Sequence, residues 1–360
     1  MKHFSFFYVL LSILFFSSCS KDNENTERLD APVVFSVSPL GGRPGTVVTI
    51  EGKNFSRLRV DNKVLFNGVE ANIIHFNENT INVQAPEGSN DGPITVQVAG
   101  QSVDGPTFGF IQPPAPTGET VVVKVLSFGI HATAGAANVP GFMEYYANIA
   151  KTRDVDFMVA REVDSVTTRG GKVDRPLVLS ELSGLPYYQF SRAILTPYQG
   201  GYFGISVYSK HRIVEKFDLS LGDNRVLSLL KVQLTEKSQV AFGGVQMEDV
   251  LAQQVKRNNQ AKILNSALND VMVPTILAGG IFLLNQEPKQ DPTFQLFEHE
   301  GYVPGCTSCG WTSTSGGTPV IADFVTYRWA REARIIKYET LDTAPGSDRK
   351  PVYVEIEFSL

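Results

Sequence analysis

The stretch Asp156-Phe157-Met158-Val159-Ala160-Arg161-Glu162-Val163-Asp164 decides how this chain of 360 residues is interpreted. Residues 155–159 are mostly apolar, which is typical of a buried strand. Charged residues follow at once, because Arg161, Glu162 and Asp164 stand close behind the apolar run. The stretch therefore predicts a core strand that leads into a charged segment.

Strands and helices alternate on both sides of this stretch, through residues 119–360. Apolar, β-branched runs predict further strands, and two segments have the spacing of amphipathic helices. The predicted strands are 121–128, 200–209, 226–234, 240–242 and 274–278, and the predicted helices are 142–151 and 251–268. Mixed hairpins and crossovers in this order predict two sheets with flanking helices, which is an α/β sandwich.

Several segments of residues 119–360 resemble the endonuclease/exonuclease/phosphatase family, and they follow one another in the family's order. The strand that leads to Glu162 resembles the one that carries the family's metal-binding glutamate. Ala322-Asp323-Phe324-Val325 resembles the family's Ile-Asp-Tyr-Ile, and Gly346-Ser347-Asp348-Arg349-Lys350-Pro351 resembles its closing Ser-Asp-His. Because the matches are collinear, the resemblance implies the family's DNase-like fold, a two-sheet α/β sandwich, over the whole region.

Members of this family hydrolyse phosphate esters with a magnesium-type ion, which prefers several oxygen ligands. The resemblance implies that Glu162 ligates the metal and that Asp323 and Asp348 belong to the site. Five other positions depart from the family pattern, and each loses a functional group. They are Gly129 for an asparagine, Gln246 for the histidine of Thr-His-Leu-Asp, Gly280 and Phe282 for the aspartate and asparagine of Gly-Asp-Phe-Asn, and Arg349 for the catalytic histidine. Glu248 stands where the aspartate of Thr-His-Leu-Asp would be.

These departures have physical consequences. Glycine offers no side chain to a metal or a water molecule, phenylalanine cannot donate to phosphate, and arginine stays protonated near neutral pH. We therefore expect a degenerate, non-catalytic domain, a pseudoenzyme that uses no cofactor, in which Glu162 and Asp348 hold a cation weakly if at all. The alternative is a divergent hydrolase of phosphate esters that still uses Mg²⁺ or Mn²⁺.

The resemblance also implies a geometry, because the family fold brings these strand ends together. We expect Glu162, Asp323, Asp348 and Arg349 to converge, with Phe282 beside them. Arg349 should contact Asp323 or Asp348, since a buried guanidinium without a partner is unfavourable. A bidentate pair of Arg349 with Asp323 would stand where the family's Asp–His dyad lies. Two roles stay open for this cluster, namely ligand binding and a structural ion-pair network.

Residues 31–111 predict a separate module of short β-branched strands, with turn signals such as Asn67-Gly68 and Asp91-Gly92 between them. Regularly spaced strands of this kind predict an antiparallel sandwich. The run from Ser38 through Gly45-Thr46 to Phe55 resembles an IPT/TIG immunoglobulin-like domain, which is most often a spacer and sometimes a binding surface. Residues 112–118 are rich in proline, which favours a stiff, extended linker to the region 119–360.

The N-terminus predicts export. A charged start and the short apolar run 4–16 precede Ser17-Ser18-Cys19, which resembles a bacterial lipoprotein signal peptide, residues 1–18, cleaved before a lipidated Cys19. Residues 19–30 form a polar tether, and similar acidic stretches occur in surface-exported lipoproteins of Bacteroidetes. We expect a lipid-anchored protein of the outer membrane at the cell surface. The alternative is an ordinary secretory signal with an incidental cysteine.

Two cysteines, Cys306 and Cys309, remain once Cys19 carries lipid. In an oxidising compartment they predict a small disulfide loop, with two free thiols as the alternative. The net charge of −5 and the absence of basic runs in the sequence argue against nucleic acid as a partner. The identity of the ligand stays open, and a glycan and another surface protein are both candidates.

Overall fold

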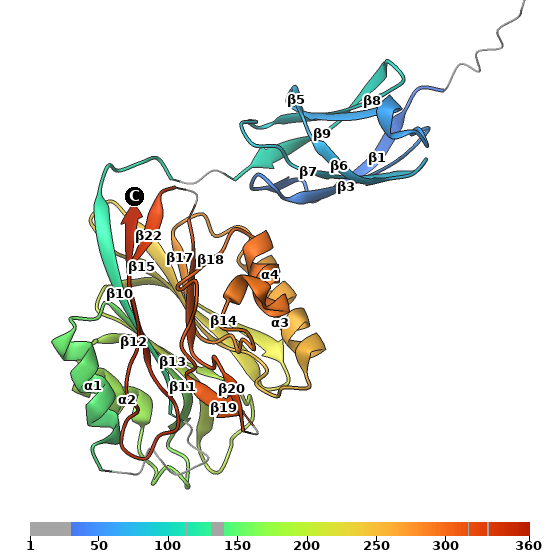
Figure 1. The fold of residues 1–360 in the computed structure, drawn as a ribbon. Coiled ribbons are helices and arrows are strands. Elements are labelled where there is room, and N and C mark those ends of the chain that lie inside the picture. The colour runs from blue at the N-terminus through green and yellow to red at the C-terminus, as the bar shows by residue number, and fades with distance from the viewer. Residues whose placement is uncertain (1–29, 112–113, 131–139, 316, 330) are drawn as a thin grey trace, which may run out of the picture. The chain divides into compact units, whose positions relative to one another are not determined.

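The computed structural model describes residues 30–111, 114–130, 140–315, 317–329 and 331–360, and Figure 1 shows its ribbon. The described chain divides into two compact units, residues 30–40 with 47–108 and residues 41–46 with 109–360. Among the helices that the structure describes, none is long and apolar enough to cross a bilayer.

The first unit is a β-sandwich, as the sequence predicts. One sheet has the strand order β1-β3-β7-β6 and the other β2-β9-β8-β4-β5. The elements of these two sheets and the short helix between them are β1 (Val33–Ser38), β2 (Gly41–Gly42), β3 (Val47–Lys53), η1 (Arg59–Asp61), β4 (Asn62–Phe66), β5 (Val69–Glu70), β6 (Asn72–Phe76), β7 (Thr80–Gln84), β8 (Gly92–Val98) and β9 (Gln101–Phe110), of which β2 and the last two residues of β9 are counted with the second unit. Alternate residues of β3 and β7, such as Ile50 and Ile81, are fully buried, so each sheet turns one apolar face to the core. Positive φ at Asn67 and Gly68 closes the tight turn between β4 and β5.

The second unit contains two six-stranded sheets, β12-β13-β11-β10-β23-β22 and β14-β15-β16-β17-β21-β18, and a small β19-β20 hairpin. Its helices are α1 (Phe142–Thr152), α2 (Arg175–Ser183), α3 (Gln254–Ala267), η4 (Pro288–Gln290) and α4 (Pro292–His299). Its strands are β10 (Thr120–Gly129), β11 (Phe157–Ser165), β12 (Tyr187–Arg192), β13 (Tyr202–Ser209), β14 (Ile213–Gly222), β15 (Arg225–Gln233), β16 (Gln239–Gln246), β17 (Thr275–Gly280), β18 (Val303–Pro304), β19 (Ser313–Ser315), β20 (Thr318–Val320), β21 (Phe324–Arg328), β22 (Ala333–Thr340) and β23 (Val352–Ser359).

Alternating side chains of the central strands pack the two sheets against each other and the helices against the sheets. In β11, Phe157 and Val159 face the second sheet and pack in the core between the sheets, whereas Met158 and Ala160 pack under the helices. Helices α1 and α2 cover the outer face of the first sheet, and α3 and α4 cover that of the second, as Figure 1 shows. The result is the predicted α/β sandwich with helices on both outer faces.

Strand direction decides which residues meet at one end of this sandwich. β10 and β11 are parallel, with Gly129 opposite Arg161, and β16 and β17 are parallel, with Gln246 opposite Gly280. β21 runs antiparallel to β17, with Phe324 opposite Gly279, and β23 runs antiparallel to β10. The ends of β10, β16 and β17, the middle of β11 and the beginnings of β21 and β23 therefore lie at the same edge.

Candidate functional site

A buried ion pair between Arg161 and Asp323 occupies this edge. Nε of Arg161 donates to Oδ1 of Asp323 at 3.0 Å, and Nη2 donates to Oδ2 at 2.6 Å. The hydroxyl of Ser127, on β10, also donates to Oδ1 at 2.9 Å. Arg161 is 1% exposed and Asp323 is fully buried, so the bidentate pair lies out of water.

Charge balance explains why Arg161 can be buried as a cation. Burial alone disfavours the charged guanidinium, but the carboxylate of Asp323 and then that of Glu162 outweigh it. The pKa of Arg161 is consequently raised above its ordinary value. A fixed positive charge therefore stands in the middle of the site at every physiological pH.

Two glycines make room for this guanidinium. A Cβ atom on Gly129 would lie 3.0 Å from Nη2 of Arg161, and a Cβ atom on Gly280 would lie 2.8 Å from Nη1. Both distances are shorter than an ordinary van der Waals contact, and the guanidinium cannot withdraw without breaking its bonds to Asp323. The two departures from the family pattern at 129 and 280 are thus sterically coupled to Arg161.

The backbone aims Glu162 into the same cluster. Its φ is +57°, and the pairing of β11 with β13 shifts register between Ala160 and Val163, as in a β-bulge. Oε1 of Glu162 lies 3.6 Å from Nη1 of Arg161 and 3.6 Å from Nη2 of Arg349. Within the described residues this buried oxygen has no hydrogen-bond partner, so it interacts with both guanidinium groups through charge alone.

Of the two partners expected for Arg349, Asp348 lies within salt-bridge distance, whereas Arg161 holds both carboxylate oxygens of Asp323. Nη2 of Arg349 instead faces Glu162, and its Nε lies 3.9 Å from Oδ1 of Asp348. The side chain of Asp348 is 55% exposed, whereas Arg349 is buried. The structure therefore brings Glu162, Asp323 and Arg349 together around Arg161 and leaves Asp348 at the rim.

Phe282 lies in an apolar cluster next to β17. It is 3% exposed and packs with Val320, Ala322 and Leu251. Its φ of +60° is unusual for a side chain of this size. Arg257, which is fully buried, places its guanidinium carbon 5.3 Å from the centre of the Phe282 ring. The position where the family has a polar residue is therefore filled with hydrocarbon.

Gln246 and Glu248 follow one another at the end of β16 without joining the ion cluster. Gln246 is 3% exposed, and its Oε1 finds no hydrogen-bond donor among the described side chains and backbone. Glu248 accepts from the backbone N–H groups of Asp249 and Val250, each at 3.1 Å, and lies 3.2 Å from Arg225. Glu248 is therefore occupied in holding its own loop.

Thr312 fastens two site segments to each other. Its Oγ1 accepts the backbone N–H groups of Ala322 and Asp323, at 2.7 and 3.1 Å. Its carbonyl oxygen accepts the N–H of Lys350 at 2.8 Å. The carboxylate of Asp323 and the segment that carries Arg349 thus share one anchor.

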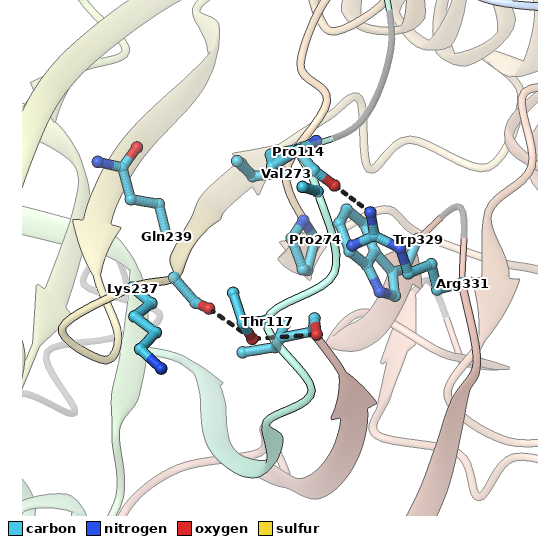
Figure 2. Close-up of a pocket in the computed structure, with 11 residues that line it drawn as sticks. Pro114, Thr117, Lys237, Gln239, Val273, Pro274, Trp329 and Arg331 are labelled. Carbon is cyan, nitrogen blue, oxygen red and sulfur yellow. Dashed lines mark hydrogen bonds between the residues drawn. The ribbon is translucent and has the colours of Figure 1, made fainter.

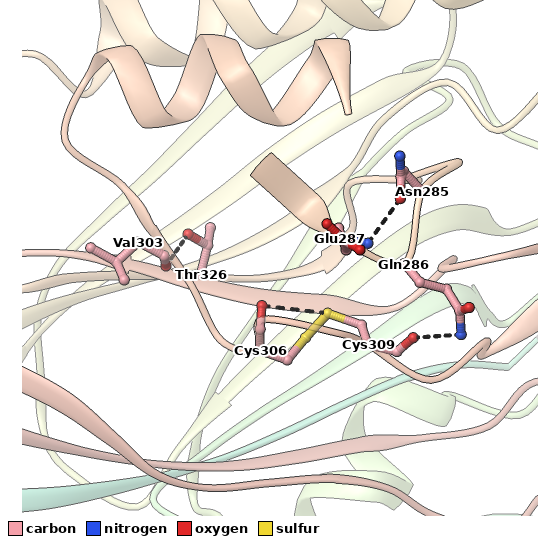
Figure 3. Close-up of a disulfide and its surroundings, with 7 residues drawn as sticks. All are labelled: Asn285, Gln286, Glu287, Val303, Cys306, Cys309 and Thr326. Atoms are coloured by element: carbon pink, nitrogen blue, oxygen red, sulfur yellow. Dashed lines mark hydrogen bonds between the residues drawn. A yellow bond between two sulfur atoms is a disulfide. The ribbon is translucent and has the colours of Figure 1, made fainter. Parts of the chain in front are cut away.

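A disulfide closes the loop that leads to Thr312. Cys306 and Cys309 are bonded, as Figure 3 shows. The N–H of Cys309 donates to the carbonyl oxygen of Gln286 at 2.7 Å, and Nε2 of Gln286 donates back to the carbonyl oxygen of Cys309 at 3.0 Å. This loop therefore connects the segment after β17 with the segment before β21.

A divalent cation does not fit this arrangement. Among the residues that the structure describes, no three His, Cys, Asp or Glu side chains gather so that they could hold a metal ion. Gly129 and Gly280 supply no ligand atoms, and Arg161 already lies against Asp323 and Glu162. A hard cation needs several oxygen ligands without a competing positive charge between them.

Sequence reasoning missed the residues that organise this site, namely Arg161, Ser127 and Thr312. A signal for Arg161 was present, because Gly279 and Gly280 end a strand, and glycine in a strand often marks the close approach of another group. No comparable signal marks Thr312. Cys19, the predicted lipidation site, lies outside the described residues.

Residues 32–110 match the family model of the IPT/TIG domain. No curated protein matches this chain. The chain is similar to a solved endonuclease/exonuclease/phosphatase from Beutenbergia cavernae, with 18% identity and a TM-score of 0.52 over 66% of this chain and 72% of that one. It is also similar to an endonuclease/exonuclease/phosphatase family protein from Bacteroides thetaiotaomicron, with 15% identity and a TM-score of 0.51 over 68% of this chain and 98% of that one. Residues 32–110 therefore form an IPT/TIG domain, and the unit that follows has the phosphoesterase-like fold of the endonuclease/exonuclease/phosphatase proteins.

Proposed function

We propose that this protein is a surface lipoprotein whose phosphoesterase-like domain is non-catalytic and binds a ligand or partner. A lipid on Cys19 anchors it to the outer membrane, and the IPT/TIG domain acts as a spacer. A glycan or a surface protein is the favoured partner class, because the acidic sequence has no basic run that would attract nucleic acid.

One observation carries the non-catalytic part of this proposal. The guanidinium of Arg161 lies between the glycines at 129 and 280 and pairs with the carboxylate of Asp323. Phosphoester hydrolysis in this family requires a metal ion, an oriented water and a group that accepts a proton. Arg161 neutralises the carboxylates that would hold the metal, and neither it nor Arg349 accepts a proton near neutral pH.

The alternative is a divergent hydrolase of phosphate esters. The retained carboxylates of Glu162, Asp323 and Asp348 favour it, as does the presence of two guanidinium groups that could stabilise a negatively charged transition state. Mg²⁺ or Mn²⁺ would be the metal on this alternative. The donor set argues against it, because Arg161 takes both oxygens of Asp323.

A metal-screened assay separates these two functions. The full chain would be incubated with generic phosphomonoester and phosphodiester substrates and with Mg²⁺, Mn²⁺ or EDTA, beside Glu162→Ala and an active phosphoesterase of the same fold. We expect no metal-dependent turnover above the buffer rate, and no difference between the protein and Glu162→Ala. Turnover that needs metal and disappears in Glu162→Ala would establish the hydrolase instead.

The anchor has a separate test. Cys19→Ala in the full precursor should move the protein from the membrane fraction to the soluble exported fraction, because a lipid chain supplies the membrane affinity. Cys306→Ala is the matched control, since it also removes a thiol and should leave the protein with the membrane. An unchanged membrane fraction in Cys19→Ala would rule out lipid anchoring at this residue.

A further inference from the structure

A second concave site lies at the opposite end of the phosphoesterase-like unit. Its volume is about 230 Å³, and it is lined by residues at the start of β16 and β17 and after β21. Those strands carry Gln246, Gly280 and Asp323 at their other ends. The cavity is therefore separate from the ion cluster of Arg161, and nothing about it depends on the non-catalytic role proposed above.

The wall of the cavity is apolar and fixed. Val273, Pro274, Leu360 and the indole of Trp329 line it, and Figure 2 shows Val273, Pro274 and Trp329 around the opening. The indole N–H of Trp329 donates to the carbonyl oxygen of Ser359 at 2.8 Å, which holds the ring in place. A flat aromatic ring beside a proline ring suits the apolar face of a small cyclic ligand.

The polar groups of the lining carry positive charge. Lys237 and Arg331 line the cavity, and no aspartate or glutamate does. In the described part of the chain, neither cation forms an ion pair within salt-bridge distance. Arg331 lies over the Trp329 ring at 5.0 Å and donates one N–H to the carbonyl oxygen of Pro114, which leaves further donors on its guanidinium.

Lys237 interacts with one carboxylate outside the lining, that of Glu119, whose pKa is lowered by hydrogen bonds from Thr235 and Ser238 and by the charge of Lys237. Its carboxylate already accepts from the hydroxyl groups of Thr235 and Ser238, at 2.7 and 3.2 Å. Glu119 therefore stays negatively charged but does not line the cavity, whose lining side chains include two cations and no carboxylate.

We propose that this cavity binds a small ring compound that carries a carboxylate, with the ring against Trp329 and Pro274 and the carboxylate at Arg331 and Lys237. The volume supports a single ring, because cavities for larger drug-sized ligands are commonly about 300–1,000 Å³. Sugar acids and aromatic acids share this chemistry, and a titration distinguishes them.

The experiment uses intrinsic fluorescence of the full chain. The sequence has two tryptophans, Trp311 and Trp329, so Trp311→Phe leaves a signal from the cavity alone. Glucuronate, benzoate and neutral glucose would each be titrated, and calorimetry on the unsubstituted chain would repeat the result without any substitution. We expect saturable binding of glucuronate or benzoate, whichever source is correct, and binding of glucose at least about tenfold weaker.

Two variants and a matched control locate the binding. Arg331→Gln and Lys237→Gln should each weaken carboxylate binding by roughly tenfold, because each removes a charged hydrogen-bond donor. Arg334→Gln is the control, since Arg334 is exposed, pairs with Glu357 and does not line the cavity. The proposal fails if neither acid binds saturably, if neutral glucose binds as tightly as the acid that does bind, or if Arg334→Gln weakens binding as much as Arg331→Gln.

Discussion

Arg161, in the middle of β11, holds both carboxylate oxygens of Asp323, at 3.0 and 2.6 Å, from the opposite sheet. β11 belongs to one sheet of the sandwich and β21, which begins directly after Asp323, to the other. This pair therefore joins the two sheets at one edge of the sandwich, where Gly129 and Gly280 end β10 and β17.

Removal of Arg161 should destabilise the second unit strongly. Arg161→Ala leaves the carboxylate of Asp323 buried without its cation, and such a change typically lowers the free energy of unfolding by about 3–5 kcal/mol. Urea unfolding followed by tryptophan fluorescence measures it, because Trp311 and Trp329 both belong to this unit. Arg334→Ala, at an exposed ion pair, should leave the midpoint unchanged. Equal midpoints for Arg161→Ala and the unsubstituted protein would contradict the role given to this pair.

The glycine at 280 should be energetically coupled to Arg161. Gly280→Ala places a Cβ atom 2.8 Å from Nη1 of a guanidinium that Asp323 holds in place, and overpacking of this kind lowers stability by about 1–3 kcal/mol. In an Arg161→Ala background the same substitution should be nearly neutral, because the obstructing group is gone. A double-mutant cycle measures the coupling energy between the two sites. Additive effects would mean that Gly280 is retained for another reason.

Residue 129 offers an independent check on this coupling. Its Cβ atom would meet the other nitrogen of the same guanidinium, Nη2, at 3.0 Å.

The fold itself was predictable, because the apolar runs at 121–128 and 155–159 indicate central strands regardless of which residues stand at the strand ends. The five departures from the family pattern could also be read directly from the sequence. Their mutual compensation could not, since Gly129, Arg161 and Gly280 come from three separated segments.

The pairing of Asp323 with Arg161 could not be predicted from the sequence. In a regular strand, Arg161 and Glu162 would point to opposite faces, so only one of them could enter the site. The register shift between Ala160 and Val163, with φ of +57° at Glu162, brings both charges to within 3.6 Å of each other. The spacing of apolar residues in the sequence does not reveal a β-bulge. The sequence therefore named Asp323 and Asp348 as alternative partners of Arg349 and did not show that Arg161 takes Asp323.

Thr312 should matter more than its exposed neighbour Thr314. Thr312→Val keeps the shape of the side chain but removes the oxygen that accepts the N–H groups of Ala322 and Asp323. Buried donors left without an acceptor typically lower the free energy of unfolding by about 1–3 kcal/mol each. Thr314→Val, at an exposed position of the same hairpin, is the matched control. The difference in urea midpoint between the two variants measures how much the hydrogen bonds to Oγ1 of Thr312 stabilise the fold. Identical midpoints would show that they contribute nothing to stability.

Arg349→His should not restore hydrolysis, although it restores the residue type that the family has at this position. A histidine there could accept a proton, but Gly280 still offers no group to orient a water, and Phe282 still fills the neighbouring volume with hydrocarbon. Arg161 would also keep Asp323 occupied, so the new imidazole would lack the carboxylate that orients it in the family's dyad. The substitution should instead remove one of the two cations that face the buried Oε1 of Glu162, at 3.6 Å, and so lower the unfolding midpoint.

Phosphoesterase rates and urea midpoints of Arg349→His and Arg349→Lys, measured side by side, test both the expected lack of hydrolysis and the expected loss of stability. The lysine variant keeps the positive charge and should retain more of the stability. Metal-dependent turnover from Arg349→His alone would mean that the site is one residue away from activity and that Arg161 does not block it.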